Sequence, residues 1–273
     1  MNRLPLEKRA RIIGCLTEGT SMRSATRLVD VSINTVTKLL VDVGAACDLY
    51  QHETLRNLPC KRIECDEIWS FVGAKAANIE PWERNSERGD VWTWVAIDPD
   101  SKLVPSWLVG RRNTRTATIF MKDVASRLAS RVQLTTDGHR PYLNAVEEAF
   151  GSEIDYSTLT KLYASAPEAE RRYSPPVCTG AHKETVTGFP DASKASTSHV
   201  ERQNLSMRMG MRRFTRLTNG FSKKVQNHAY AVAIYYMHYN FGRIHKTLRV
   251  TPAMQAGIAD HVWTLEEIAK LAD

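Results

Sequence analysis

The sequence predicts an α/β protein in which a mixed sheet flanked by helices follows an N-terminal all-α domain. Three observations support this fold class. Residues 1–50 carry the period of amphipathic helices, strand-like runs begin at residue 61, and helix and strand patterns alternate from about residue 116. Antiparallel strands that come first and βα units that follow are typical of a mixed sheet whose faces helices cover.

The N-terminal domain, residues 1–50, has the pattern of a helix-turn-helix. Its helices are expected at residues 6–18, at residues 21–28 and from residue 32 onward. Ser32 is a good N-cap for the third helix, which would present Asn34, Thr35 and Lys38 outward. These side chains are of the types that bind base edges and phosphates in a major groove. A plain three-helix packing module is the alternative.

The later elements are recognised by β-branched and aromatic runs, by the helical periods between them and by turn residues. Strands are expected at residues 62–74, 90–101, 102–112, 131–136 and 153–159. Helices are expected at residues 116–130, 141–150, 198–217 and 222–239. These elements predict a linker at 51–60, a catalytic domain at 61–257 with an insertion and one possible hairpin at 161–197, and a helical tail at 258–273.

Composition narrows the classes of partner and compartment. The formal net charge of +7 and the pI near 9.2 favour an anionic partner such as nucleic acid. The five cysteines are scattered, with no paired spacing typical of a zinc ribbon or a disulfide framework, and are expected to be reduced. No segment is apolar and long enough to suggest a membrane span, so a cytoplasmic, nucleoid-associated protein is expected.

Three acids occupy positions from which they can converge. Asp66 lies in the middle of the first strand, Asp137 ends the fourth strand, and Glu201 lies in the first turn of a late helix. If the two strands are neighbours, these carboxylates form an oxygen-rich site of the kind that Mg²⁺ or Mn²⁺ prefers. A pair of such ions about 3.5–4 Å apart holds the attacking and leaving oxygens of a displacement at phosphorus.

Each acid also has a structural interpretation. Asp137 precedes a glycine and fits a turn, Glu201 fits a capping box that begins at Ser198, and Asp66 fits a buried ion pair. Glu67 should point to the opposite face of the strand and have a supporting or structural role. Other candidates for the third acid lie between Asp137 and Glu201: Glu147, Glu148, Glu153, Glu168, Glu170 and Glu184.

A strongly basic stretch surrounds the third acid. Between residues 199 and 250 ten lysines and arginines accompany one acid, Glu201. This imbalance favours a phosphate-binding surface beside a metal ligand over a solvated face of mixed charge, although a basic, merely soluble helix is the alternative. The residues assigned to DNA as a group are Arg202, Arg208, Arg212, Arg213, Arg216, Lys223 and Lys224.

The segments CDEIWSFVG, TTDGHRPY and HVERQNLSMRMGMRRFTRLTNGFSK resemble the IS1 family of insertion-sequence transposases. The order of strands, helices and acids resembles the ribonuclease-H-like core of DDE transposases and retroviral-type integrases, and YNFGRIHKTLRVTPAMQAG is similar to the end of many such domains. The resemblance covers about residues 60–257. Many IS1-type proteins begin with a Cys-rich zinc-binding segment, and this sequence departs from them there.

The resemblance implies a DNA transposase that cleaves the ends of an element and joins the freed 3′-OH to target DNA. It assigns Asp66, Asp137 and Glu201 as catalytic ligands of two Mg²⁺ or Mn²⁺ ions. It also implies double-stranded DNA as the partner and a homo-oligomer, at least a dimer, because two ends must be held together. Two alternatives remain open: a ribonuclease-H-like nuclease without strand transfer, and a non-catalytic helix-turn-helix regulator.

Overall fold

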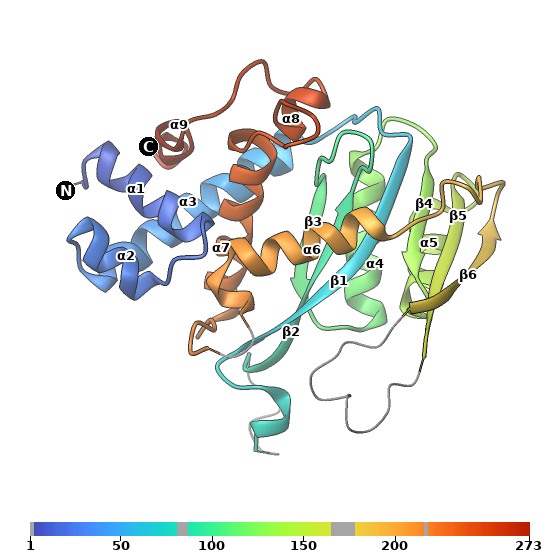
Figure 1. Ribbon diagram of the computed structural model, residues 1–273, viewed down its shortest axis with the longest axis horizontal. Coiled ribbons are helices and arrows are strands. Elements are labelled where there is room, and N and C mark those ends of the chain that lie inside the picture. The colour runs from blue at the N-terminus through green and yellow to red at the C-terminus, as the bar shows by residue number, and fades with distance from the viewer. Residues whose placement is uncertain (1–2, 81–86, 165–177, 216–217) are drawn as a thin grey trace.

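A mixed β-sheet forms the centre of the protein (Figure 1). The computed structural model describes residues 3–80, 87–164, 178–215 and 218–273. Within these ranges the strands are β1 Arg62–Val72, β2 Gly89–Ile97, β3 Ser106–Gly110, β4 Gln133–Asp137, β5 Asp155–Tyr163 and β6 Cys178–Thr187. They lie in the order β3-β2-β1-β4-β5-β6, and β1, β4 and β5 are parallel while the other neighbours are antiparallel.

Helices cover both faces of this sheet. On one face lie α4 (Thr114–Arg127) and α5 (Pro141–Phe150), where the ring of Trp94 on β2 packs against Phe120 and Tyr142. On the other face lie α6 (Ser198–Gly210) and α7 (Val225–Met237), as Figure 1 shows. The predicted fold class, a ribonuclease-H-like mixed sheet between helices that follows an N-terminal helical region, is confirmed.

The N-terminal region contains α1 (Leu6–Thr17), α2 (Met22–Val29) and α3 (Ile33–Thr54). Ser32 caps α3 as predicted, because its Oγ accepts a hydrogen bond of 3.1 Å from the Thr35 N–H. However, α3 extends well into the segment expected to be a linker from residue 51. Its end packs on α7, where the Gln51 side-chain amide donates to the Ala233 carbonyl at 3.1 Å.

Two predicted boundaries are wrong, one because of a local turn and one because of a contact with a distant segment. The expected third strand begins at Ser106 rather than Lys102, because Lys102 has a positive φ of 61° and closes the turn after Asp98. The late helix, expected to reach residue 217, ends at Gly210. There the carbonyl oxygen of Gly210 accepts a hydrogen bond of 2.8 Å from the Gly19 N–H, and a short 3₁₀ turn follows.

The predicted insertion at 161–197 contributes to the sheet. Strand β5 continues to Tyr163, and β6 pairs with it in the antiparallel direction, which agrees with the expected hairpin. The residues between these strands, 165–177, lie outside the described residues.

The C-terminal residues pack against the N-terminal helix α1. After α7 come a π turn (His238–Gly242), α8 (Pro252–Gln255) and α9 (Leu265–Lys270). Arg9 on α1 donates to the Ala269 carbonyl at 3.1 Å and pairs with Asp273 at 2.6 Å. The N-terminal helices, α7 and the tail therefore share one buried apolar core with the sheet. Across the described ranges, no helix combines the length and the apolar character that a bilayer span requires.

The crossing of α3 and α7 gives a test of this packing. A Cβ at Gly44 would lie 2.9 Å from the Tyr230 Cα, so Gly44→Ala should force the helices apart. We expect a loss of about 1–3 kcal/mol in the free energy of unfolding, which exceeds the gain of up to about 1 kcal/mol from alanine's helix propensity. Urea unfolding measures the difference. Gly180→Ala is the control because its added Cβ would meet Leu162 at 3.9 Å; equal stability of the two variants would contradict the tight crossing.

Candidate metal centre and nucleic-acid surface

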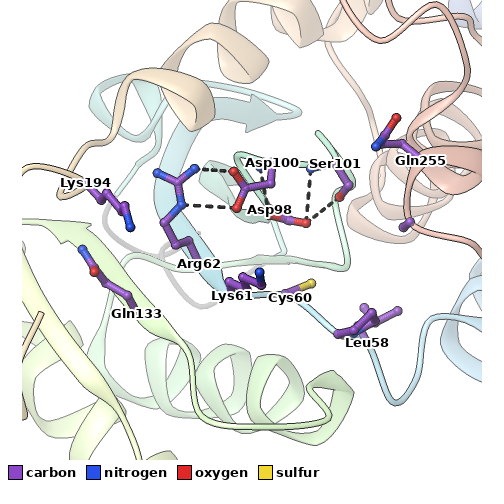
Figure 2. A pocket seen from close by; sticks show the side chains of 12 residues that line it. Leu58, Cys60, Lys61, Arg62, Asp98, Asp100, Ser101, Gln133, Lys194 and Gln255 are labelled. Atoms are coloured by element: carbon purple, nitrogen blue, oxygen red, sulfur yellow. Dashed lines mark hydrogen bonds and ion pairs between the residues drawn. The ribbon is translucent and has the colours of Figure 1, made fainter. Parts of the chain in front are cut away.

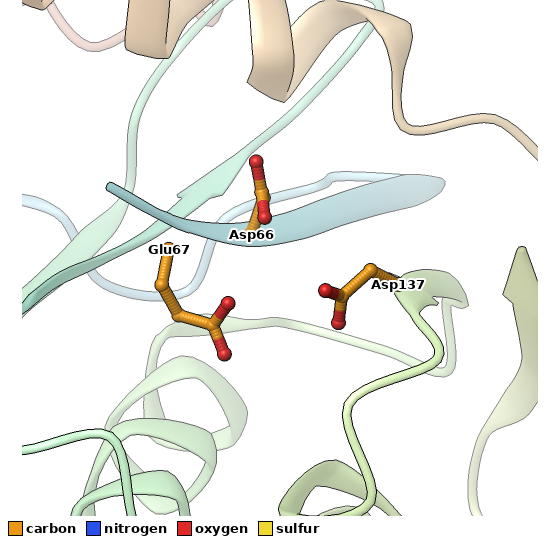
Figure 3. A group of neighbouring side chains, drawn as sticks. All are labelled: Asp66, Glu67 and Asp137. Carbon is orange, nitrogen blue, oxygen red and sulfur yellow. The ribbon is translucent and has the colours of Figure 1, made fainter. Parts of the chain in front are cut away.

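Asp66 and Asp137 lie side by side because β1 and β4 are parallel neighbours. The register pairs Cys65 with Thr136, and the two acids are the next residues along each strand. This confirms that the two strands are adjacent in the sheet. Oxygen atoms of Asp66, Glu67 and Asp137 all lie within 4.8 Å of one another (Figure 3). The group has the oxygen ligands that a hard divalent cation prefers.

Glu67 is an unexpected member of this group. It points to the opposite face of β1 from Asp66, as predicted, yet its carboxylate turns toward Asp137 (Figure 3). The ladder between β1 and β4 ends at Cys65, so a side chain on either face beyond that point has access to the end of β4. The Glu67 side chain is only 1% exposed, and its Oε1 has no hydrogen-bond partner among the described residues. The approach of Glu67 to Asp137 was not predicted from the sequence.

Burial makes the charged state of two carboxylates unfavourable. It raises the pKa of Glu67 to about 8, and the nearby Asp137 carboxylate adds to the effect while Arg112 opposes it. Burial likewise raises the pKa of Asp66 to about 6; the charges of Asp137 and Glu201 add to this, and a hydrogen bond from the Asn204 side chain opposes it. A bound cation would relieve both the burial and the mutual repulsion.

Glu201 lies on the α6 side of β1 but outside the group of three. Its Oε1 accepts a hydrogen bond of 2.7 Å from the Thr197 hydroxyl, and its Oε2 pairs with Lys161 on β5. Thr197 rather than Ser198 is the N-cap residue, and its side chain makes no cap hydrogen bond, so Glu201 is not part of the expected capping box. One turn later on α6, the Asn204 side-chain amide donates to Asp66 at 2.9 Å.

The position of α6 over the group is fixed by Glu64. This buried acid accepts hydrogen bonds from the backbone N–H groups of His199 and Val200, at 2.8 and 3.2 Å, and contacts the His199 Nδ1 at 2.8 Å. A carboxylate at a helix N-terminus is stabilised by the unpaired N–H groups and by the helix dipole. The contact of Glu64 with α6 was not predicted from the sequence, although Glu64 lies two residues before Asp66 and so on the same strand face.

Two further side chains lie beside the carboxylates. Arg112, between β3 and α4, lies 3.5 Å from Glu67 Oε2 and 3.6 Å from Asp137 Oδ2, and its guanidinium stacks 4.8 Å from the Trp92 ring centroid. His139 approaches Glu67 at 3.8 Å, and burial lowers its pKa. Nothing in the local sequence distinguishes Arg112 from Arg111, so its place beside the carboxylates was not predicted.

The helix-turn-helix residues lie at the surface. Asn34 and Lys38 are exposed and Thr35 is half-buried, while Lys38 pairs with Asp42 at 2.6 Å. Their assignment to DNA stays a prediction.

The basic residues of the late segment have different environments. Arg202, Arg212, Lys223 and Lys224 are exposed, and Arg208 is half-buried. Arg213 is half-buried: it donates to the Ser222 hydroxyl at 2.6 Å, and burial lowers its pKa to about 10. Arg216 lies outside the described residues.

A groove of about 940 Å³ joins the helix-turn-helix to this segment. It is lined by the end of α1, the starts of α2 and α3, and residues between 211 and 231. Within the described part of the chain its charged lining residues are all basic: Arg23, Arg212, Arg213, Lys223 and Lys224. Such a surface is suited to a polyanion.

A second cavity, of about 540 Å³, lies at the other end of β4 from Asp137 (Figure 2). Its charged groups are largely satisfied internally. Arg62 pairs with Asp100, and buried Asp98 accepts hydrogen bonds from the backbone N–H groups of Asp100 and Ser101. The carboxylate group at the β4 end is therefore the stronger candidate for chemistry.

No protein family and no curated protein matches the sequence. Among solved structures, the chain is similar to the Mos1 transposase in a paired-end complex with the left transposon end, with a TM-score of 0.24 and 11% identity. That alignment covers 57% of this chain and 60% of the other, so it spans less than two thirds of either chain. At this TM-score the similarity does not bear on the activity.

The Glu64 contact generates one prediction. Glu64→Ala should lower the free energy of unfolding by about 1.5–3 kcal/mol, the range for hydrogen bonds to a charged group. It should also speed amide hydrogen exchange at His199 and Val200, whereas Glu64→Gln, which keeps an acceptor oxygen, should have a smaller effect. Hydrogen exchange read by NMR measures both amides. Glu184→Ala, on exposed β6, is the control; unchanged exchange in Glu64→Ala would show that α6 is held by other contacts.

The raised pKa values of Asp66 and Glu67 lead to a prediction about how stability depends on pH. Their values of about 6 and about 8 exceed the ordinary 3.8 and 4.5, so the folded protein binds more protons than the unfolded chain between those limits. Stability in EDTA should therefore fall as pH rises from about 4 to about 8. Glu67→Gln, which cannot titrate, should flatten the upper part of this fall in thermal unfolding. Glu147→Gln is the control and should show the same dependence of stability on pH as wild type. If Glu67→Gln also shows that same dependence, the prediction is refuted.

Proposed function

We propose that this protein is a DNA transposase of the DDE type, related to the IS1 family, which cleaves element ends and transfers the freed 3′-OH to target DNA. The observation that carries the proposal is the group of three carboxylates at the rim of the sheet, with a fourth on the helix above it. Basic residues on that helix and in the adjoining groove support a DNA substrate.

The donor set fits a divalent cation. All donors are carboxylate oxygens, Glu67 Oε1 is buried and has no hydrogen-bond partner within the described ranges, and burial raises the pKa of Asp66 and of Glu67. We assign Asp66 and Asp137 as central ligands of Mg²⁺ or Mn²⁺. Glu67 and Glu201, which flank Asp66 from opposite faces of β1, are the ligands through which two ions can be held.

When bound, such ions would lower the pKa of the attacking oxygen and neutralise charge on the phosphate. The chain itself provides the placement. Glu64 holds the first turn of α6, and Asn204 on the same helix holds Asp66 through its side-chain amide. Glu201 must leave Lys161 to act as a ligand. Because the nucleophile is water or a 3′-OH, no serine or tyrosine is assigned to attack.

The proposed DNA-binding surface consists of the helix-turn-helix residues and the basic residues of the groove and of α6. Asn34, Thr35 and Lys38 on α3 are proposed to contact the duplex at the element end, and the groove arginines and lysines to track its phosphates toward the carboxylates. Arg202 and Arg208, on α6 itself, lie nearest in sequence to Glu201. A dimer or larger homo-oligomer is proposed as the working unit, because each reaction joins two ends.

Cleavage of DNA that contains the sequences flanking the gene tests the proposal. With Mg²⁺ or Mn²⁺, the wild type should produce 3′-OH ends and joined products that EDTA abolishes. Asp137→Asn should reduce the rate by about 10²-fold or more, because a ligand charge at the phosphoryl-transfer centre is lost. Glu147→Gln, an exposed acid on α5, is the matched control and should retain activity.

The same experiment distinguishes Glu201 from Glu67 as the third catalytic acid, and it distinguishes the proposed function from its alternatives. Loss in Glu201→Gln but not in Glu67→Gln would assign Glu201 as the catalytic ligand, and the reverse result would assign Glu67. Cleavage without joined products would indicate a nuclease. DNA binding with no cleavage in any protein would indicate a regulator that uses the helix-turn-helix, and cleavage that survives Asp137→Asn would mean that the assigned acids are wrong.

A further inference from the structure

Arg112 occupies the place where positive charge is needed at the carboxylate group. It lies 3.5 Å from Glu67 Oε2 and 3.6 Å from Asp137 Oδ2, so one guanidinium bridges two of the three acids. Lys161 similarly pairs with Glu201 on the other side of β1. The carboxylates assigned to metal binding are thus partly neutralised by side chains of the chain itself.

The bridge made by Arg112 is loose. Charge-assisted hydrogen bonds between a guanidinium and a carboxylate are usually about 2.7–2.9 Å long, and both contacts exceed this. One oxygen of Glu67, Oε1, has no hydrogen-bond partner in the part of the chain that the structure describes. The Arg112 side chain is also 35% exposed, which weakens an ion pair through solvent screening. A divalent cation in direct contact with the oxygens is expected to displace it.

A displaced Arg112 would not move far. Its guanidinium stacks on the Trp92 ring at 4.8 Å, and the loop that carries it is short, because β3 ends at Gly110 and Asn113 caps α4 through a 3.0 Å hydrogen bond from the Thr116 N–H. Stacking on an aromatic ring leaves the donor edge of a guanidinium free to bind another group. That edge would remain at the rim beside the carboxylates.

We propose that Arg112 is a resident counter-cation that a divalent metal displaces, and that the released guanidinium then binds a phosphate of the DNA at the carboxylate group. This inference rests on the proposed function, because it requires both the metal and the DNA. It adds a residue that touches substrate and couples the two binding events: Arg112 opposes metal binding and contributes to DNA binding only when metal is present.

Metal titration tests the first half. Mn²⁺ binding is measured by calorimetry for wild type, Arg112→Gln and Arg111→Gln. Arg111 is the matched control, since it lies in the same loop and makes no ion pair with described residues. Loss of the competing charge in Arg112→Gln should tighten Mn²⁺ binding about fivefold, the scale of a half-exposed ion pair. Arg111→Gln should match wild type, and Asp137→Asn should lose binding. Circular dichroism checks that each variant is folded.

DNA binding tests the second half. Fluorescence anisotropy of a short duplex is measured in EDTA and in Ca²⁺, which takes oxygen ligands as Mg²⁺ does. With Ca²⁺ the Arg112→Gln variant should bind about tenfold more weakly than wild type, the scale of a hydrogen bond to a charged group. In EDTA the two should bind alike. Arg111→Gln should show the same ratio to wild type in both solutions, and Arg112→Lys should recover part of the loss.

The outcomes separate this inference from the proposed function. Tighter metal binding together with a metal-dependent loss of DNA affinity supports the inference. If Arg112→Gln binds metal as tightly as wild type or more weakly, the displacement of Arg112 is overturned. The proposed function then remains intact as long as wild type binds metal. Tighter metal binding without the metal-dependent DNA loss overturns the phosphate contact. If wild type binds no metal, the proposed metal centre fails and the inference fails with it.

Discussion

Negative charge on the central strand is the constraint on which the rest of the site depends. Strand β1 carries Glu64, Asp66 and Glu67 within four residues, and Glu64 and Glu67 are buried. Unpaired charge in such positions costs several kcal/mol, so each acid needs a partner. The partners are recruited from different parts of the chain: the start of α6 for Glu64, an amide of α6 for Asp66, and the loop before α4 for Glu67.

These partners differ in how well they satisfy the charge, and the difference separates the structural acid Glu64 from the acids of the proposed metal site. Glu64 accepts two backbone hydrogen bonds and holds a helix, which makes it part of the framework. Glu67 keeps an oxygen without a hydrogen-bond partner among the described residues, and its cation is a half-exposed arginine. Incomplete neutralisation leaves the rim of the sheet ready to accept a stronger cation. The same helix that Glu64 anchors also carries Glu201 and begins the basic stretch.

The sequence predicted much of the fold. The change of period at residue 61 and the capping residue Ser32 identified elements that the structure contains, because these signals are local. The start of β3 was wrong because of the local turn that Lys102 closes, and the other errors occurred where distant segments pack on the helix ends. Helix α3 is prolonged by its packing on α7, and α6 is stopped where Gly210 accepts a hydrogen bond from the α1–α2 connection. The local pattern of apolar and polar residues does not show contacts of this kind, because the contacting residues lie far apart in the sequence.

The sequence by itself determined which strands and helices form, that acids end or interrupt two of the strands, and that positive charge gathers after residue 199. Only the tertiary structure decided which acids meet. The ladder between β1 and β4 stops one residue before Asp66, and Glu67 approaches Asp137 from the opposite face. Glu201 lies outside this group and pairs with Lys161. Register, the length of a neighbouring strand and the choice of ion-pair partner are properties of assembled elements, and no single segment encodes them.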